Sequence, residues 1–177
     1  MAKRPCLPKC PSKLKLSSKE LGRGAYGAVR EGKFKGRPVA VKTVHSEIAR
    51  DKPLEDFIRE CQLLASLESH PNIIQSYGAF ESRTGEPMLV LERMKENLRE
   101  YLQRNNSTLT RKRQLEICLN IVSGLKFLHE RNPPVAHRDV TDKNVLIGED
   151  GSVKVSDLGQ SKLLENGDVY MLSLIHI

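Results

Sequence analysis

The sequence predicts an α+β fold in two lobes, because strand patterns and one helix come first and helices with a small hairpin follow. In the first half, Pro38–Lys42 is a short β-branched run, and the apolar residues between Leu54 and Leu67 recur at helical spacing. In the second half, two helical patterns precede two short apolar runs. We expect a cleft between the lobes to bind the ligand.

The first lobe is expected to be an antiparallel sheet with one helix. Leu21–Val29 enters and leaves a glycine-rich turn, and Met88–Leu91 has the composition of a buried strand. The dipeptide His70-Pro71 ends the helix that starts near Leu54, because proline cannot continue a helix.

The second lobe is expected to be mainly helical. A short helix is predicted over Asn97–Arg104 and a longer one over Arg113–Glu130, which Pro133-Pro134 ends. The runs Val145–Ile147 and Val153–Val155 predict two paired strands. The longer helix carries an apolar stripe that we expect to be buried, formed by Leu115, Cys118, Leu119, Val122 and Leu125.

The net charge of +7 is concentrated at the start of the chain. Residues 1–19 hold six basic residues and no acidic one, whereas the rest of the chain holds 23 basic and 22 acidic residues. We therefore expect a solvated, disordered tail over 1–19 and no specific nucleic-acid partner. No run of 18 apolar residues predicts a membrane span, and no apolar stretch follows Lys3 and Arg4, so a cytoplasmic protein is expected.

The four cysteines do not have the spacing of a zinc site. Cys6 and Cys10 lie in the basic tail, and Cys61 and Cys118 fall in helical patterns. We expect reduced thiols, with metal binding or oxidation at the first two as the alternative.

Gly22, Gly24 and Gly27 have the spacing Gly-x-Gly-x-x-Gly, which fits either a dinucleotide-binding turn or a plain hairpin. A strand pattern, and not a helix, follows Val29, which argues against the first reading. Glycines on a hairpin also allow backbone amides to approach phosphate oxygens.

Lys42 lies in an apolar strand and needs an anionic partner, because burying an unpaired ammonium is costly. Glu60 lies 18 residues later, in the middle of the predicted helix. A lysine held by this carboxylate can contact the α- and β-phosphates of a nucleotide. The alternative is a surface lysine and a solvated glutamate.

The segment His137–Asn144 carries the strongest chemical pattern. Asp139 can accept a proton from an incoming hydroxyl or orient it, and Asn144, five residues later on a loop between strands, can bind a hard cation through its amide oxygen. Asp157 follows a short strand 13 residues after Asn144 and offers a second oxygen ligand for Mg²⁺. Asp-x-Gly by itself is usually a turn.

In this order, the motifs from Leu21 to Lys162 resemble the signature set of eukaryotic protein kinases, and in particular the tyrosine-kinase-like group. The resemblance implies an enzyme that uses ATP and Mg²⁺ to phosphorylate a hydroxyl of a protein substrate. It implies that Leu91–Met94 is the gatekeeper and hinge. The implied catalytic residues are Asp139, Lys42, Glu60, Arg138 and Lys143, and the implied metal ligands are Asn144 and Asp157. The implied nucleotide-binding residues are Gly22, Gly24, Gly27, Val29, Ala40, Lys42, Glu92, Met94 and Leu146.

Three positions depart from the commonest family pattern. Thr141 stands where serine/threonine kinases usually have lysine. The basic residue is instead Lys143, four residues after Asp139, an arrangement that resembles the tyrosine kinases. Leu158 stands in the Asp-x-Gly motif where phenylalanine is commonest. In the tyrosine-kinase-like group, serine/threonine or dual specificity is favoured over tyrosine specificity. Ser161 and Tyr170 are expected to be ordinary surface residues.

The resemblance divides the chain into the tail (1–19), an N-lobe with hinge (20–94) and a partial C-lobe (95–171), without the family's later helices. Residues 172–177 resemble an in-frame translation of a sequencing-library adaptor, the alternative being a genuine apolar strand. We expect the chain alone to be inactive. The sequence specifies no oligomeric state.

Two other functions remain to be weighed. A nucleotide-binding pseudokinase or regulatory fragment without turnover is disfavoured, because Lys42, Glu60, Asp139, Asn144 and Asp157 are all present. A nicotinamide-dependent dehydrogenase is disfavoured by the strand pattern after the glycines.

Overall fold

The computed structural model describes residues 7–23, 27–44 and 52–164. These residues fall into two compact units. Unit 1 consists of Met1–Glu68 with Gln75–Met94, and unit 2 consists of Ser69–Ile74 with Lys95–Ile177. The chain therefore has the two-lobed α+β organisation that the sequence predicts.

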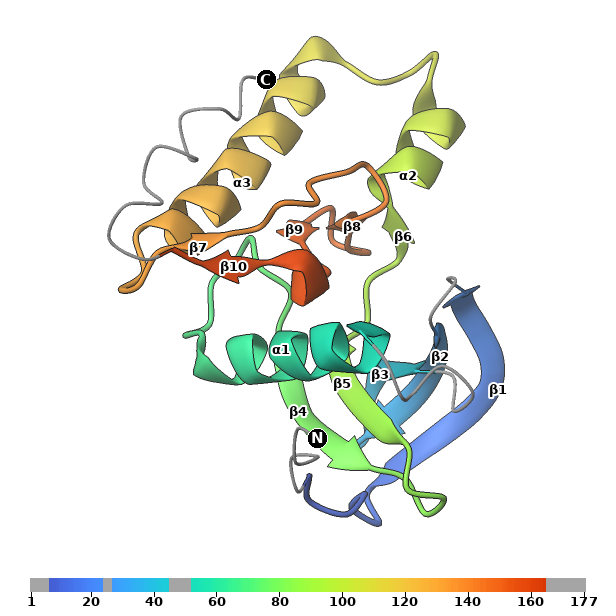
Figure 1. The fold of residues 1–177 in the computed structure, drawn as a ribbon. Helices are drawn as coiled ribbons and strands as arrows, with labels where there is room; N and C mark the ends of the chain where they lie inside the picture. The colour runs from blue at the N-terminus through green and yellow to red at the C-terminus, as the bar shows by residue number, and fades with distance from the viewer. Residues whose placement is uncertain (1–6, 24–26, 45–51, 165–177) are drawn as a thin grey trace. The chain divides into compact units, whose positions relative to one another are not determined.

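Unit 1 is a five-stranded antiparallel sheet with the strand order β1-β2-β3-β5-β4 and one helix, α1 (Lys52–Ser66), which packs against β3 and β4 (Figure 1). The strands are β1 (Leu14–Arg23), β2 (Gly27–Phe34), β3 (Arg37–Val44), β4 (Ser76–Glu81) and β5 (Pro87–Glu92). The hairpin around the glycines, the helix and the strands near Pro38 and Met88 are confirmed. Sequence analysis did not identify β4.

The pleat of β3 separates two kinds of side chain. Val39 and Val41 are fully buried and pack with Met88 and Val90 of β5. Because successive side chains of a strand point to opposite faces, Ala40 and Lys42 lie on the other face.

The sheet begins earlier than the sequence pattern suggests. β1 starts at Leu14, inside the segment expected to be a disordered tail. The chain before it also pairs with the sheet, since the backbone N–H of Cys10 donates to the carbonyl of Glu81 and the N–H of Glu81 donates to the carbonyl of Pro8, both at 2.8 Å. The strand was not predicted because the five residues after Leu14 are mostly lysines and serines, and Leu14 is the one residue of β1 that is buried.

Within its described residues (69–74 and 95–164), unit 2 contains two α-helices, α2 (Leu98–Asn105) and α3 (Arg111–His129). Asn97 caps α2 by accepting from the N–H of Glu100, and Thr110 caps α3 by accepting from the N–H of Arg113. The remaining elements are β6 (Glu96–Asn97), β7 (Val135–Ala136), β8 (Val145–Ile147), β9 (Val153–Val155), the 3-10 helix η1 (Leu158–Gln160) and β10 (Lys162–Leu163). Strands β6, β8 and β9 form one sheet, and β7 pairs with β10.

The prediction of the buried face of α3 is wrong, because the apolar stripe expected to be buried is mostly exposed. Leu115, Leu119 and Val122 are 57%, 69% and 49% exposed, and Cys118 is exposed as well. The buried residues are Ile117, Gly124 and Leu128. Ile117 belongs to the same core cluster as the β8–β9 hairpin, and Gly124 lies against Asn72 of the segment 69–74. Two apolar stripes run along this helix, and helical spacing alone cannot decide which one meets a neighbour.

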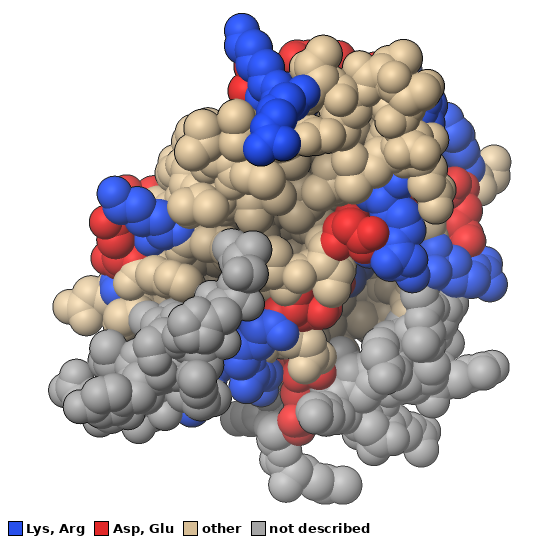
Figure 2. Space-filling view, turned by 90° about the horizontal axis from the view of Figure 1, so that it is seen from above, with Lys and Arg blue, Asp and Glu red and all other residues tan. Residues whose placement is uncertain are grey.

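The described surface mixes charges of both signs. On the face drawn in Figure 2, the described Lys and Arg side chains lie beside Asp and Glu side chains and form no continuous basic field. Among the described residues, no helix combines the length and the apolar character needed to cross a membrane.

Gly124 provides a test of the packing between α3 and the segment 69–74. A Cβ atom at this position would lie 2.6 Å from the backbone carbonyl oxygen of Asn72. That carbonyl also accepts from the N–H of Val155, so the backbone there cannot move freely. We expect Gly124→Ala to lower the free energy of unfolding by about 1–3 kcal/mol, as overpacking does.

The measurement is urea unfolding followed by circular dichroism. Ser123→Ala, one position earlier on α3, is the matched control and should change stability by less than about 0.5 kcal/mol. Equal midpoints for Gly124→Ala and the unaltered chain would contradict the close approach.

Candidate active site

In unit 1, Lys42 of β3 is joined to Glu60 of α1. The Nζ atom of Lys42 donates to Oε2 of Glu60 at 2.7 Å. The side chain of Glu60 is only 1% exposed, whereas that of Lys42 is 26% exposed. The pair therefore compensates the buried carboxylate, while part of the Lys42 side chain is exposed.

The glycines of the β1–β2 hairpin differ in what surrounds them. A Cβ atom at Gly27 would lie 2.0 Å from the carbonyl oxygen of Thr43, so the β2–β3 pairing itself requires glycine there. A Cβ atom at Gly22 would meet nothing within 4 Å. Gly24 lies outside the described residues. Of the two described glycines of this motif, Gly27 is required by packing and Gly22 is not.

Val29 and Ala40 lie on the same face of the sheet as Lys42. Val29 is the register partner of Lys42, and Ala40 is two residues before Lys42 on β3. Directly opposed residues of an antiparallel pair share a face, as do residues two apart on one strand. These two apolar side chains and the ammonium therefore line one surface of unit 1.

The predicted hinge follows β5. The backbone N–H of Glu92 donates to the carbonyl of Gln75 at 3.0 Å, and the Glu92 carboxylate accepts from the N–H of Gln75 at 2.7 Å. Met94, the last residue of unit 1, is buried at 6% exposure. The N–H of Glu92 is therefore bonded within unit 1.

In unit 2, the loop between β7 and β8 is organised by His137. This residue is 1% exposed, and its Nδ1 atom accepts from the N–H of Asp139 at 3.3 Å. Its Nε2 atom must then carry the proton, which it donates to the carbonyl of Ser156 at 3.0 Å. Burial lowers the pKa of His137 below its ordinary value of 6.5, in agreement with a neutral ring.

Asn144 connects the loop to Asp139 and to the strand β9. Its Nδ2 atom donates to the carboxylate oxygen Oδ2 of Asp139 at 2.8 Å and to the Asp139 carbonyl at 2.9 Å. The backbone carbonyl of Asn144 accepts from both the backbone N–H and the hydroxyl of Ser156, at 2.8 and 2.9 Å. The carboxylate of Asp139 is thereby oriented, and the amide of Asn144 retains its oxygen for a cation.

Asp157 directly follows Ser156 and has a left-handed backbone with φ of +61°. Its carboxylate accepts from the N–H of Gly159 at 3.4 Å. Leu158 is fully buried, so an apolar side chain anchors the turn at the position where phenylalanine is commonest in the family. Arg138 also has a positive φ, +65°, and its Nε atom donates to the carbonyl of Gln160 at 2.7 Å.

Asn144 and Asp157 fit the role of cation ligands. Both offer oxygen atoms, which Mg²⁺ prefers, and Ser156 joins them through adjacent backbone. Within the described residues there is no group of three or more His, Cys, Asp or Glu side chains able to hold a metal. Mg²⁺ commonly takes only one or two carboxylates and completes its shell with substrate phosphates and water.

Arg99 of α2 is a residue that sequence analysis missed. Its guanidinium donates two hydrogen bonds to the carboxylate of Asp142, at 2.8 and 2.9 Å, and its N–H donates to the Asp142 carbonyl at 3.1 Å. Arg99 lowers the pKa of the Asp142 carboxyl. The neighbouring Lys143 is exposed. Arg99 and Asp142 are 43 residues apart, so no local pattern could have revealed the pair.

The burial of Leu146 and Ser161 can be compared with what the sequence predicts. Leu146 is partly buried and alternates with the buried Val145 and Ile147, so it faces away from the core of unit 2. Ser161, expected at the surface, is 1% exposed, and its hydroxyl donates to the carbonyl of Leu158. Tyr170 and residues 172–177 lie outside the described residues.

The antiparallel sheet with one helix in unit 1 and the helices and short strands of unit 2 fit a truncated two-lobed protein kinase fold, and comparison with known proteins agrees. The family model described as protein tyrosine and serine/threonine kinase matches residues 15–174. The chain belongs to this family.

Three relatives illustrate the similarity. The serine/threonine-protein kinase VIK of Arabidopsis thaliana is 33% identical over 172 residues, which are 92% of this chain and 38% of that protein. The serine/threonine-protein kinase CTR1 of the same plant is 29% identical over 159 residues, 89% of this chain and 19% of that protein. The dual specificity protein kinase shkA of Dictyostelium discoideum is 32% identical over 148 residues, 84% of this chain and 28% of that protein. The chain thus spans well under half the length of these relatives.

The neutral, buried His137 predicts a pH dependence of stability. The folded state lowers the pKa of this residue, so between that value and 6.5 the unfolded chain binds more protons than the folded one. Stability should therefore be complete above pH 7 and fall as the pH drops through 6.5. His70 and His129 have pKa values lowered by burial as well and should contribute in the same direction.

We expect the urea midpoint of the chain to decrease between pH 7.5 and 5.5, and to decrease less in His137→Gln. Comparing the difference between the two pH values within each variant removes the constant effect of the substitution. An identical pH dependence in both proteins would contradict a neutral His137.

Proposed function

We propose that this domain transfers the γ-phosphoryl group of ATP to a hydroxyl of a protein substrate, with serine and threonine favoured over tyrosine. The observation that carries the proposal is the hydrogen bond from the Asn144 amide to the Asp139 carboxylate. It orients the proposed catalytic carboxylate and commits the nitrogen of Asn144, which leaves the oxygen for Mg²⁺. The family membership supports the reaction class.

The residues of unit 1 are proposed to bind the nucleotide. Lys42, held by Glu60, would neutralise the α- and β-phosphates, and Gly22 would allow the backbone of the hairpin to approach them. Val29 and Ala40 would contact the adenine ring. The carbonyl of Glu92 and the backbone of Met94 would read its edge. The pocket is therefore proposed to combine apolar contact with a few backbone hydrogen bonds.

The residues of unit 2 are proposed to carry the chemistry. Asn144 and Asp157 would hold Mg²⁺, which supplies charge neutralisation to the phosphates when bound. Asp139 would accept the hydrogen bond of the substrate hydroxyl and orient it. The partly exposed Leu146 would also contact the adenine ring. Arg138 would hold the segment after Asp157 through Gln160, and the exposed Lys143 would neutralise the transferred phosphoryl group.

The preference for serine and threonine rests on two supports. VIK and CTR1 are named serine/threonine-protein kinases, and shkA is named a dual specificity protein kinase. The motif pattern places this chain near the tyrosine-kinase-like group, whose members mostly phosphorylate serine and threonine. Phosphoamino-acid analysis of a reacted protein mixture distinguishes the three hydroxyls.

The role of Asp139 predicts a selective loss of turnover. We expect Asp139→Asn to reduce phosphoryl transfer by about 10²–10⁴-fold while binding of Mg-ATP changes little. The assay measures transfer of radiolabelled phosphate to a generic protein substrate, using the whole polypeptide that the natural locus encodes. Undiminished transfer by the variant would refute the role, and Mg-ATP binding without transfer by the unaltered protein would favour a regulatory nucleotide-binding function.

The contrast between two glycines predicts separable effects on binding and stability. Gly22→Ala should weaken Mg-ATP binding by roughly tenfold, the equivalent of one charged hydrogen bond, and leave the unfolding midpoint unchanged. Gly27→Ala should instead lower the unfolding midpoint, because its Cβ would collide with the Thr43 carbonyl. Fluorescent ATP-analogue titration and urea unfolding measure the two effects. Loss of stability in Gly22→Ala, with unchanged nucleotide affinity, would contradict the assignment.

A further inference from the structure

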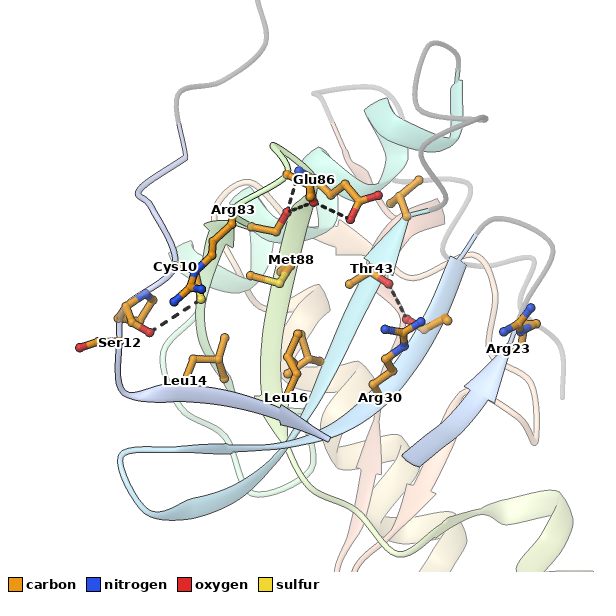
Figure 3. A pocket seen from close by; sticks show the side chains of 16 residues that line it. Cys10, Ser12, Leu14, Leu16, Arg23, Arg30, Thr43, Arg83, Glu86 and Met88 are labelled. Atoms are coloured by element: carbon orange, nitrogen blue, oxygen red, sulfur yellow. Dashed lines mark hydrogen bonds between the residues drawn. The ribbon is translucent and has the colours of Figure 1, made fainter. Parts of the chain in front are cut away.

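A groove of about 800 Å³ lies on unit 1 (Figure 3). Val41 and Thr43 of β3 line it, so it lies on the face of the sheet opposite to Lys42, because successive side chains of a strand point to opposite faces. Its floor consists of the core side chains Leu14, Val41 and Met88, which are 8%, 0% and 2% exposed. Leu16 of β1 adds an apolar side chain that is 46% exposed. We call this site the strap groove, because the segment 8–12 forms one of its walls.

The walls of the strap groove are held by hydrogen bonds. The segment 8–12 is attached to β4 through Glu81, by two backbone bonds and by the ion pair of Lys9 with its carboxylate at 2.8 Å. The β4–β5 hairpin, which directly follows Glu81, forms a neighbouring wall, and in it the Ser82 hydroxyl accepts from the N–H of Glu86 at 3.0 Å. A site whose walls are already ordered loses little conformational entropy when a ligand binds.

The rim of the groove is basic. Arg23, Arg30 and Arg83 line it together with one acidic residue, Glu86 (Figure 3). Arg23 is neutralised by two hydrogen bonds to the carboxylate of Glu20, at 2.9 and 2.7 Å. Neither Arg30 nor Arg83 forms an ion pair or a side-chain hydrogen bond with any other described residue. Within the described residues, therefore, these two guanidinium groups have no ion-pair partner, and they lie beside an apolar floor.

We propose that the strap groove binds an acidic peptide segment of a partner protein, with a bulky apolar side chain on the floor and carboxylates on Arg30 and Arg83. Arginine pairs with carboxylates in a bidentate geometry, and an apolar anchor in a preformed pocket supplies the remaining affinity. The N-terminal residues 1–6 carry Lys3 and Arg4 and no acid, so their charge does not match the rim. A purely polyanionic ligand would leave the apolar floor unused.

The probe is a fluorescein-labelled peptide of sequence Gly-Asp-Glu-Leu-Phe-Glu-Asp, titrated with the full 177-residue chain by fluorescence anisotropy. Two matched peptides serve as controls, one with the four acids replaced by their amides and one with Leu and Phe replaced by Ser. We expect binding of the first peptide to be saturable and to weaken with added salt. Each control peptide should bind at least about tenfold more weakly, since each lacks one of the two required contacts.

Variants of the chain locate the site. Arg30→Glu and Arg83→Glu should each reduce affinity by about tenfold, the loss expected for one charged hydrogen-bonded contact. Arg37→Glu is the matched control, because Arg37 is exposed on β3, does not line the groove and undergoes the same charge reversal. Equal weakening by Arg37→Glu would mean that only net charge matters and would overturn the proposal.

Cysteine reactivity provides a second readout that does not depend on mutation. Cys10 lies in the groove wall and is partly exposed, whereas Cys118 is exposed on α3 in unit 2. Burial raises the pKa of Cys61 to about 12, so this thiol should remain unmodified. Bound peptide should slow alkylation of Cys10 and leave Cys118 unchanged, as measured by mass spectrometry.

Besides equal weakening by Arg37→Glu, three results would overturn the proposal. Equal binding of the acidic and amide peptides removes the role of the arginines, and equal binding of the serine peptide removes the role of the floor. A dimer of the chain that dissociates in Arg30→Glu, with no peptide bound, would assign the groove to a second copy of this chain.

Discussion

A carboxylate buried to 1% exposure in the middle of α1 is the constraint on which unit 1 depends. Glu60 cannot remain ionised in that position without a cation beside it, and Lys42 supplies one at 2.7 Å. The pair joins the helix to the central strand of the sheet. The pair also marks the polar face of β3. Side chains alternate along a strand, so Val39 and Val41 lie on the opposite face. Val29 and Ala40 share the face of Lys42, and the proposed nucleotide surface follows from that alternation.

The proposed catalytic and metal-binding residues of unit 2, Asp139, Asn144 and Asp157, lie on loop backbone that is neither helix nor long strand. Such backbone must satisfy its polar groups through side chains, and His137, Asn144 and Ser156 do so. The same bonds that stabilise the loop orient the carboxylate of Asp139. Arg138 and Asp157 both have positive φ, a conformation that costs free energy and persists because these surrounding contacts determine it.

The sheet of unit 1 presents two surfaces of different chemistry. One carries Lys42 and the proposed nucleotide contacts, and the other carries an apolar groove with a basic rim. Because side chains alternate across a strand, Val41 and Lys42 are neighbours in sequence and belong to different surfaces. A substitution that changes one surface can therefore leave the other intact, so the proposed nucleotide binding and the proposed peptide binding can be tested separately in this unit.

Much of this architecture was determined by the sequence alone. The hairpin around the glycines, the strand at Lys42, the helix at Glu60 and the β8–β9 hairpin all follow from local patterns, because turn residues and side-chain periodicity act over a few residues. The pairing of Lys42 with Glu60 could also be anticipated, since a lysine in an apolar strand requires a counter-charge. The order of the motifs then sufficed to indicate the family.

Only the tertiary structure decided which apolar face of α3 is buried, that Ser161 is enclosed, that Arg99 holds Asp142, and that the segment 8–12 joins the sheet. Each of these outcomes depends on residues that meet from distant parts of the chain. Local periodicity reports that a face is apolar or that a side chain is charged. It contains no information about which neighbour will cover that face or pair with that charge.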